Sequence, residues 1–350
     1  MFTNVLKINP DNFRTKELKE ACDILKNGGL VAFPTETVYG LGGDALNPDA
    51  SSKIYKAKGR PSDNPLIVHI ADMQGLYDVA DDISENGKKL AKAFWPGPLT
   101  MVFKKKNIVP LSTTGGLYTV AVRMPGHAIA RELILQSGVY IAAPSANISG
   151  RPSPTKAEHV IEDLDGRIDM IIDGGSVGIG IESTIVDVSC DETVILRPGY
   201  ITKDMIEDVV GNVSIDAAIK GIPKKDILPK APGMKYRHYA PKGQLFIVKG
   251  DACMVAAKIN RLVYEKENKG YKVAVIATDE SIIDYKCNIV KSIGSRQHED
   301  SIAARLYDVL REMDYLNVKY IYSESFGDDI LGGAVMNRML KAAAYNIINA

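Results

Sequence analysis

The chain has 350 residues, of which 45% are hydrophobic and 25% charged, and this length favours about two domains over one core. Lys plus Arg and Asp plus Glu each number 43, so any attraction to nucleic acid must come from a local patch. No run approaches the roughly 18 apolar residues of a membrane span, and the N-terminus lacks the pattern of a signal peptide. We therefore expect a cytoplasmic protein.

The four cysteines are spaced singly, with no CxxC pair, so neither a structural zinc site nor a disulfide framework is predicted. Cys22 lies in an amphipathic helical pattern, and we expect it to be a buried small hydrophobic residue.

From Lys7 to about Tyr200, short apolar runs alternate with helical patterns, which predicts a strand-rich α+β domain. The last predicted helix starts with Thr155 and Glu158 at capping-box spacing, with Thr155 as the N-cap. The predicted strands are Leu30–Phe33, Leu66–Ile70, Leu99–Phe103, Thr119–Arg123, Val139–Ala143, Met170–Asp173, Thr184–Val188 and Thr193–Arg197. The predicted helices are Lys16–Lys26, Ser51–Ala57, Met73–Val79, Ser84–Phe94, Ala128–Gln136 and Lys156–Leu164.

The pattern changes after residue 200, so we divide the chain into a domain at 1–200, a linker at 201–243 and a second domain at 244–350. The linker contains a predicted helix, Lys203–Val210, and the stretch APGMKYRHYAPKG. The second domain alternates strands and helices, which predicts a Rossmann-like parallel sheet, but it has no GxGxxG motif and a dinucleotide role is poorly supported. Its predicted strands are Gln244–Val248, Lys272–Thr278, Asn288–Ser292 and Lys319–Ser323, and its predicted helices are Asp251–Asn268, Asp300–Leu316 and Gly333–Ile348.

The stretch from Ala32 to Arg60 joins a buried strand to a Thr/Gly-rich turn and a group of cations. We expect Lys58 and Arg60 to leave the helix at Gly59 and to converge on an anion such as a triphosphate. A solvated basic helix end explains this motif equally well when it is judged alone. The turn supplies hydrogen-bonding side chains and glycines at which a ligand could approach the backbone: Thr35, Glu36, Thr37, Tyr39, Gly40, Gly42 and Gly43.

Further polar groups stand at strand ends. His69 alone is more typical of a packed core residue, whereas Arg123 must find a partner or a ligand, and its planar fork suits a carboxylate. Hydroxyl, amide and guanidinium groups follow other strands. Each of the motifs that carry them is, when judged alone, typical of an ordinary turn. Together they favour a nucleotide site: Ser145, Asn147, Arg151, Ser153, Ser183, Thr184 and Arg197.

The chain has no GxSxG elbow, no Cys-His pair and no GxxxxGK[ST] loop. Catalysis is therefore expected to rest on holding two substrates in line and on neutralising phosphate charge, with Mg²⁺ bound mainly by the phosphates. No carboxylate cluster is dedicated to a metal; Glu182 and Asp187 are the candidate outer-shell groups.

The motifs FPTETVYGLGG, KAKGRPSDNPLIVHI, WPGPLT, AVRMPGH, APSANISGRPSPT, IESTIVD and LRPG resemble, in order and spacing, the YrdC-like domain of threonylcarbamoyl-AMP synthases. APGMKYRHYAP and GGAVMNRMLKAA, at Gly332–Ala343, resemble the long two-domain form of that family. The resemblance implies an α/β chain with an N-terminal α+β YrdC-like domain, its twisted mixed sheet surrounding a concave basic cavity, and a smaller C-terminal Rossmann-like domain.

The resemblance also implies substrates and site residues. The substrates would be ATP, L-threonine and bicarbonate or CO2, and the products threonylcarbamoyl-adenylate and pyrophosphate, with the adenylate passing to a tRNA-modifying partner. Lys58 and Arg60 would be catalytic. The residues that bind L-threonine would be Thr37, His69, Arg123, Ala143 and Ser183. The residues that bind ATP would be Lys58, Arg60, Asn64, Thr119, Ser145, Asn147, Ser153, Arg197 and Tyr236. Tyr236 would also be part of a lid.

Two other functions compete with this hypothesis. A basic surface that grips triphosphate could instead bind RNA weakly, although the zero net charge argues against it. A carbamoyl-transfer enzyme using carbamoyl phosphate is the second alternative, but such chains carry zinc-finger and acylphosphatase segments that are not found here. The C-terminal domain could be regulatory, a lid support or a docking surface.

Overall fold

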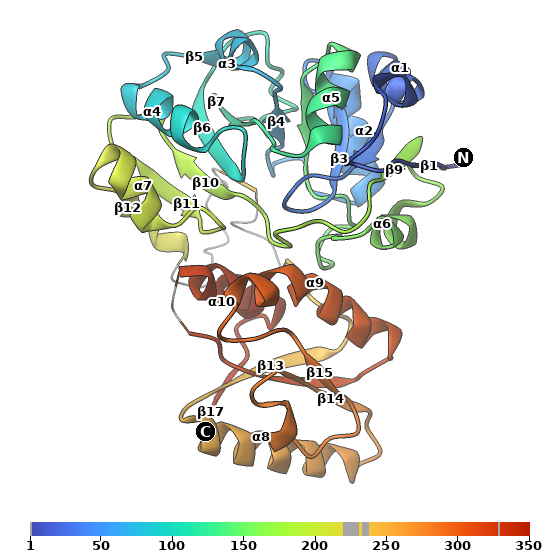
Figure 1. Ribbon diagram of the computed structural model, residues 1–350, viewed down its shortest axis with the longest axis vertical. Helices are drawn as coiled ribbons and strands as arrows, with labels where there is room; N and C mark the ends of the chain where they lie inside the picture. Colours follow the sequence, from blue (N-terminus) through green and yellow to red (C-terminus); the bar gives the residue numbers. More distant parts are fainter. Residues whose placement is uncertain (1, 220–230, 233–237, 328–329) are drawn as a thin grey trace. The chain divides into compact units, whose positions relative to one another are not determined.

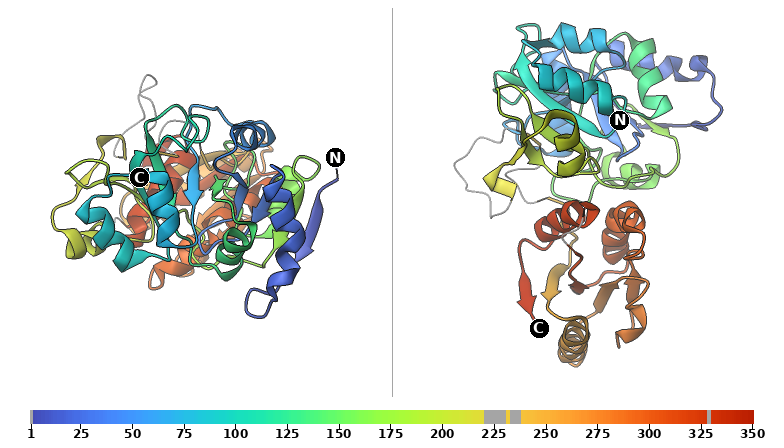
Figure 2. Two further views of the ribbon diagram at one scale, coloured as in Figure 1. Left: turned by 90° about the horizontal axis from the view of Figure 1, so that it is seen from above. Right: turned by 60° about the vertical axis from the view of Figure 1, so that its left-hand side comes forward.

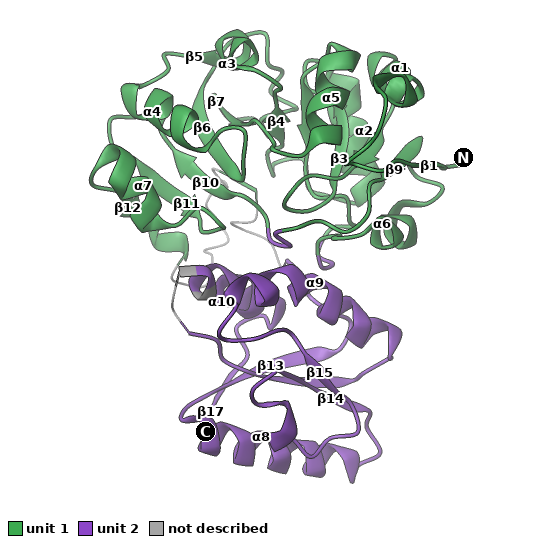
Figure 3. Ribbon diagram, viewed as in Figure 1, with its two compact units in different colours: residues 1–149, 153–178, 182–236 green, residues 150–152, 179–181, 237–350 purple. Residues whose placement is uncertain are grey.

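Two units with different kinds of sheet make up the chain (Figure 3). The computed structural model describes residues 2–219, 231–232, 238–327 and 330–350. The first unit comprises residues 1–149, 153–178 and 182–236, and the second comprises residues 150–152, 179–181 and 237–350. Two short segments therefore cluster with the second unit although they interrupt the first unit in sequence.

In the described part of the first unit, twelve strands form one mixed sheet in the order β1-β9-β2-β3-β8-β4-β7-β6-β10-β11-β12, with β5 paired to β6. The strands are β1 (Asn4–Lys7), β2 (Val31–Phe33), β3 (Gly40–Asp44), β4 (Ile67–His69), β5 (Ala80–Asp81), β6 (Leu99–Lys105), β7 (Thr119–Arg123), β8 (Ile141–Ala143), β9 (Met170–Asp173), β10 (Thr184–Asp187), β11 (Val194–Arg197) and β12 (Ser214–Ile215). The helices are α1 (Lys19–Lys26), α2 (Pro48–Lys58), α3 (Met73–Val79), α4 (Glu85–Phe94), α5 (Ala128–Ser137), α6 (Ala157–Leu164) and α7 (Lys203–Val210).

Alternation along the strands sends side chains to two separate cores in this unit. Ala32 joins a broad core that also contains Val68 and Val122, whereas its neighbours Val31 and Phe33 join a core on the other face. That second core is covered by α1 and α5, and it contains the predicted buried cysteine, Cys22. The α1/α5 core involves β2, β8 and β9 but not the ends of β4 and β7, which leaves room for polar side chains there.

The second unit contains a five-stranded sheet in the order β15-β14-β16-β13-β17, and all of its described pairings are parallel. Helix α8 lies on one side of the sheet, and α9 and α10 lie on the other (Figures 1 and 2). Apolar residues of α8 pack on β13, β14 and β16, which completes the layered arrangement predicted from the alternation. The elements are β13 (Gln244–Lys249), α8 (Ala252–Glu267), β14 (Val273–Ala277), β15 (Val290–Ser292), α9 (Glu299–Tyr315), β16 (Tyr320–Glu324), α10 (Ile330–Ala342) and β17 (Ile347–Asn349).

The fold class is confirmed, but three local predictions are wrong. The glycine-rich stretch after Tyr39 is the strand β3, not a turn. Helix α6 has Lys156, not Thr155, as its N-cap, without a side-chain capping hydrogen bond, and the Thr155 hydroxyl is buried with no partner among the described residues. Helix α10 ends at Ala342 rather than at Ile348, because Ala344 and Tyr345 adopt positive φ and the chain turns into β17.

None of the helices in the described ranges combines the length and the apolar character of a membrane-spanning segment.

Candidate active site

The ends of three neighbouring strands place polar side chains on one face of the first unit's sheet. His69 and Arg123 are register partners on β4 and β7, and Arg123 is also opposite Thr100 on β6. Register partners point to the same face of a sheet. Two residues away along the strands, Ile67, Ala121 and Val102 form a small apolar cluster on this face, so the polar set begins where that cluster ends.

Arg123 is the centre of this set. Its side chain is only 5% exposed, and its Nη1 donates a 2.9 Å hydrogen bond to the hydroxyl of Thr37. Thr35 donates to the Val38 carbonyl, so the Thr37 hydroxyl, which accepts from Arg123, donates to Thr35 over 2.9 Å. This chain of hydrogen bonds fixes the turn after β2 against the end of β7.

Arg123 also has a charged partner on that turn. Its Nη2 lies 2.7 Å from Oε1 of Glu36, and its Nε donates to the carbonyl of Gly97 at 3.3 Å. Burial of the Glu36 carboxylate raises its pKa, but the charge of Arg123 and the donors around the carboxylate, which are Arg123 and the backbone amides of Gly126 and Glu36, together outweigh burial, and the net effect is a lowered pKa. Glu36 is therefore ionised at neutral pH.

His69 is a neutral ring beside this cation. Its Nδ1 lies 3.1 Å from the carbonyl of Ile67, and the Phe33 ring meets it edge-on with centroids 6.1 Å apart. Burial, followed by the charge of Arg123, lowers the pKa of His69 to about 3. The imidazole can therefore exchange hydrogen bonds with a ligand at neutral pH but adds no positive charge.

A second arginine approaches the same face from β11. Arg197 donates to both the carbonyl and the hydroxyl of Ser183, through its Nη2, at 3.0 and 3.2 Å. The Ser183 hydroxyl lies 2.7 Å from that of Thr100, which connects Arg197 to β6. Gly199 allows this close packing, because a Cβ there would lie 2.5 Å from the backbone nitrogen of Thr184.

The turn after β8 meets the end of α2. Gly59, in the left-handed conformation, ends α2, and the Nζ of the buried Lys58 donates to the carbonyls of Ser145 and Asn147, each at 2.5 Å. The Ser145 hydroxyl donates to the Asn147 side chain at 2.5 Å, and Ser145 is bridged to Gly40 of β3. Lys58 is thus held beside a turn of small hydrogen-bonding groups.

Comparisons with known proteins agree with these motifs. A family model described as "Telomere recombination" matches residues 23–199, and one described as "Threonylcarbamoyl-AMP synthase, C-terminal domain" matches residues 201–344. The chain belongs to the threonylcarbamoyl-AMP synthase family. The resemblance inferred from the sequence is confirmed.

Two curated relatives in the family are similar over nearly their whole length. The threonylcarbamoyl-AMP synthase of Bacillus subtilis (strain 168) is 50% identical over 333 residues, covering 95% of this chain and 94% of that protein. The one from Pyrococcus abyssi (strain GE5 / Orsay) is 48% identical over 332 residues, covering 95% of each chain. The crystal structure of P. abyssi Sua5 complexed with L-threonine has a TM-score of 0.93 and 45% identity, covering 100% of both chains.

Other residues predicted for this family's site are less closely gathered. Arg60 lies beyond the end of α2 and donates to the carbonyls of Asn64 and Pro65, whereas Lys58 donates to the turn after β8. Oδ1 of Asn64 is buried without a hydrogen bond among the described residues. Thr119 begins β7, four residues from Arg123, which corresponds to about 13 Å along a strand. Tyr236 lies outside the described residues.

Ala143 and Ser153 have clearer positions. Ala143 ends β8 opposite Ile67 of β4, so it can offer a ligand only its backbone and its methyl group. Ser153 donates a 2.6 Å hydrogen bond to the buried carboxylate of Glu182. The other proposed outer-shell carboxylate, Asp187, instead accepts from Ser189 at the far end of β10. Only Glu182 of these two therefore contacts a predicted site residue.

The glycines of β3 do not open the site to a ligand, which corrects our prediction for them. A Cβ on Gly42 would lie 2.6 Å from the Ile141 side chain, and one on Gly43 would lie 3.1 Å from Leu30. These glycines allow close packing of the sheet against its own side chains. A Cβ on Gly40 would likewise lie 3.4 Å from the side chains of both Ala143 and Phe33.

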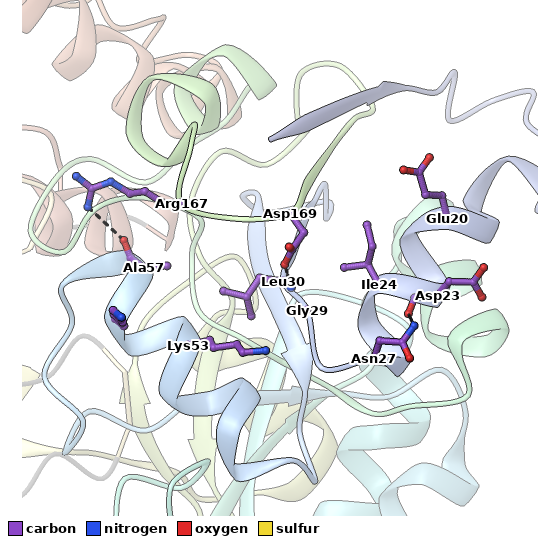
Figure 4. A pocket seen from close by; sticks show the side chains of 11 residues that line it. Glu20, Asp23, Ile24, Asn27, Gly29, Leu30, Lys53, Ala57, Arg167 and Asp169 are labelled. Carbon is purple, nitrogen blue, oxygen red and sulfur yellow. Dashed lines mark hydrogen bonds between the residues drawn. The ribbon is translucent and has the colours of Figure 1, made fainter. Parts of the chain in front are cut away.

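Lys53 and Lys56, which are close to Lys58 in the sequence, do not lie with it in this site. Lys53 and Lys56 line a separate pocket between α1 and α2, together with Asp169 and Arg167 (Figure 4). Lys53 donates to the carbonyl of Gly28 at 2.6 Å. This pocket contains none of the predicted threonine or ATP residues.

Sequence reasoning missed Thr100 and the role of Glu36 as the partner of Arg123. Thr100 follows the WPGP turn inside an apolar strand, where a lone threonine gives no signal of its own. Its significance comes only from the register of β6 with β7 and β10.

Proposed function

We propose that the chain is an L-threonylcarbamoyladenylate synthase, a nucleotidyltransferase that makes threonylcarbamoyl-AMP and pyrophosphate from ATP, L-threonine and bicarbonate or CO2. The observation that carries this proposal is the buried Arg123, held by Thr37 beside the neutral His69. The full-length similarity to P. abyssi Sua5 complexed with L-threonine supports it.

The amino-acid end of the site can be understood from charge and shape. Arg123 would bind the carboxylate of threonine, since a planar guanidinium matches two carboxylate oxygens. Thr37, His69 and Ser183 would supply neutral hydrogen bonds, and the backbone of Ala143 would contribute a carbonyl. A neutral His69 is useful here, because it adds no second cation beside Arg123.

The reaction then needs the amine to become a carbamate. The ammonium form of threonine and bicarbonate give the carbamate, one water molecule and one proton. A carbamate oxygen attacks the α-phosphorus of ATP, the bond to the leaving phosphate breaks, and pyrophosphate departs. The protein's part in this step is to align the two substrates and to exclude water.

The nucleotide end would use cations and small donors. Lys58, Arg60 and Arg197 would stabilise the negative charge that develops on the phosphates. Other predicted ATP contacts are Asn64, Thr119, Ser145, Asn147, Ser153 and Tyr236. The described residues contain no group of three or more His, Cys, Asp and Glu side chains suited to a metal. We therefore propose Mg²⁺ held mainly by ATP, with the buried Glu182 as an outer-shell acceptor.

The product would serve a further enzyme. We expect the adenylate to pass, in the cytoplasm, to tRNA threonylcarbamoyltransferase machinery that modifies the adenosine beside the anticodon, giving t6A. Weak RNA binding by the chain itself would help this transfer, and its signature would be a steep dependence on salt.

The test is product formation from labelled bicarbonate. Purified protein with ATP, Mg²⁺, L-threonine and ¹⁴C-bicarbonate should form a labelled compound that also contains adenylate, and omission of any substrate should abolish it. Arg123→Ala should reduce the rate about 100-fold or more, mainly by raising KM for threonine. Arg167→Ala, at an exposed arginine of the separate pocket, is the matched control. Labelled product formed without threonine would refute the proposal.

A further inference from the structure

Glu36 has a shielded carboxylate that can accept more hydrogen bonds than the described chain supplies. Its side chain is 20% exposed, yet both carboxylate oxygens are shielded from solvent. Arg123 and the Gly126 amide lower its pKa from nearby, but neither carboxylate oxygen has a hydrogen bond of good geometry among the described residues. Its close contact is the 2.7 Å ion pair with Nη2 of Arg123, which likewise lacks hydrogen-bond alignment. A buried carboxylate in this condition is costly unless a further donor arrives.

Arg123 cannot bind an added carboxylate without a change at Glu36. Its Nε donates to Gly97, its Nη1 to Thr37, and its Nη2 faces Glu36, so all three nitrogens already have a neighbour. A substrate carboxylate would bring a second negative charge to one guanidinium in a buried place.

The nearby histidines do not balance that second charge. Burial, followed by the charge of Arg123, lowers the pKa of His69, and burial lowers the pKa of His127 although the charge of Glu36 opposes this. Both rings are neutral at neutral pH. An α-amino acid solves the problem itself, because its ammonium group accompanies its carboxylate, and two carboxylates, one guanidinium and one ammonium sum to zero charge.

We infer that Glu36 is a further residue of the amino-acid site, which binds the α-ammonium group of the substrate while Arg123 binds its carboxylate. Glu36 then selects zwitterionic amino acids against simple carboxylic acids, which would leave two anions competing for Arg123. This inference rests on the proposed function, since it takes L-threonine as the ligand.

The test compares two ligands that differ in the ammonium group. L-threonine and 3-hydroxybutyrate, which has the same skeleton without the amine, are titrated calorimetrically into the full chain. Wild type should bind threonine tightly and 3-hydroxybutyrate measurably but at least about tenfold more weakly. Glu36→Gln should raise the dissociation constant of threonine at least about tenfold. It should bind 3-hydroxybutyrate as well as, or better than, wild type. Glu192→Gln, at an exposed glutamate, should change neither.

The outcomes separate the alternatives. If Glu36 only held Arg123 in place, Glu36→Gln would weaken both ligands together, and the inference would be wrong. Unchanged threonine binding in Glu36→Gln would also overturn it. If Glu36→Gln does not fold, Glu36→Asp keeps the charge and should retain the preference for threonine; loss of that preference in a folded Glu36→Asp would contradict us. Failure of wild type to bind threonine at all would instead refute the proposed function.

Discussion

Each unit contains a glutamate whose carboxylate is shielded from solvent beside an arginine, and the hydrogen bonds to the two carboxylates differ. In the second unit, Oε1 of Glu324 accepts from the Thr278 amide and the Ser281 hydroxyl, both at 2.8 Å, and lies 3.2 Å from Nη2 of Arg296. Its Oε2 accepts from Tyr285 at 3.0 Å. In the first unit, Glu36 has Arg123 and the Gly126 amide as neighbours, but neither of its carboxylate oxygens has a hydrogen bond of good geometry in the described chain.

This difference distinguishes a buried carboxylate that stabilises the fold from one that can bind a ligand. A fully hydrogen-bonded carboxylate stabilises its surroundings and has no capacity left for a ligand. A carboxylate without aligned donors remains costly until something binds. Glu324 ends β16, at the edge where ligands commonly bind to parallel sheets, yet its donors are already in place. The hydrogen bonds that a buried carboxylate already makes therefore indicate a ligand site better than the position of that carboxylate in the fold does.

The largest effect should come from breaking the first unit's site at Lys58. Lys58→Ala removes a buried cation held at the Ser145 turn, and we expect turnover to fall about 100-fold or more because developing phosphate charge loses its partner. Single-turnover release of pyrophosphate measures this. The matched control is Lys56→Ala, at an exposed lysine, and an equal loss in both variants would contradict the role of Lys58.

Removing Glu324 should affect stability and leave chemistry intact. Glu324→Ala removes the acceptor of the Thr278 amide, the Ser281 hydroxyl and the buried Tyr285 hydroxyl, so the free energy of unfolding should fall by about 1 to 3 kcal/mol. Denaturant unfolding gives that number, and turnover per folded molecule should equal that of wild type. Glu265→Ala, on the exposed side of α8, is the control. A specific loss of turnover in Glu324→Ala would show that this network also serves a ligand.

A smaller effect is expected at the turn that joins Ser183 to Arg197. Gly199→Ala would place a Cβ 2.5 Å from the Thr184 nitrogen, and the resulting backbone shift should cost about 1 to 3 kcal/mol. Thermal unfolding measures the loss. Gly178→Ala has open space around its Cβ position and should be nearly neutral. If Gly199→Ala were also neutral, the close packing of β10 on the turn after β11 would be in error.

The free energy of unfolding should also change with pH through the protonation of His69, by a small amount at each step of the titration. Its pKa is lowered in the folded chain to about 3, so the unfolded state binds the proton first as the pH falls. The stabilisation is complete above the unfolded pKa of about 6.5 and declines below it by at most about 1.4 kcal/mol per pH unit. His69→Gln should flatten this decline between pH 6 and 4, whereas His298→Gln, at an exposed histidine, should not. Parallel curves for wild type and His69→Gln would show that His69 titrates normally.

Much of this architecture could be predicted from the sequence because it depends on local patterns. Apolar runs predicted β7 and β9, and periodicity predicted α3 and α7 with their observed bounds. The strand β3 was missed because its glycines suggest a turn, and they become understandable only when Phe33 and Ile141 are seen to occupy the space beside them.

The site was predictable in its residue types but not in its pairings. The position of Arg123 at a strand end predicted that it binds a carboxylate. Its contact with Glu36 joins residues far apart in sequence, so no periodic pattern indicates it. The link from Thr100 to Ser183 likewise depends on strand register. Long-range partners decide which buried charges are satisfied, and a single sequence does not contain that information.

The most direct test of the central claim is pyrophosphate release from ATP by wild type, Arg123→Ala and Glu324→Gln, with and without L-threonine and bicarbonate. Our account predicts release that requires both co-substrates, a loss of about 100-fold in Arg123→Ala at subsaturating threonine, and a rate in Glu324→Gln equal to wild type per folded molecule. Release that does not depend on threonine, or equal losses in the two variants, would contradict it.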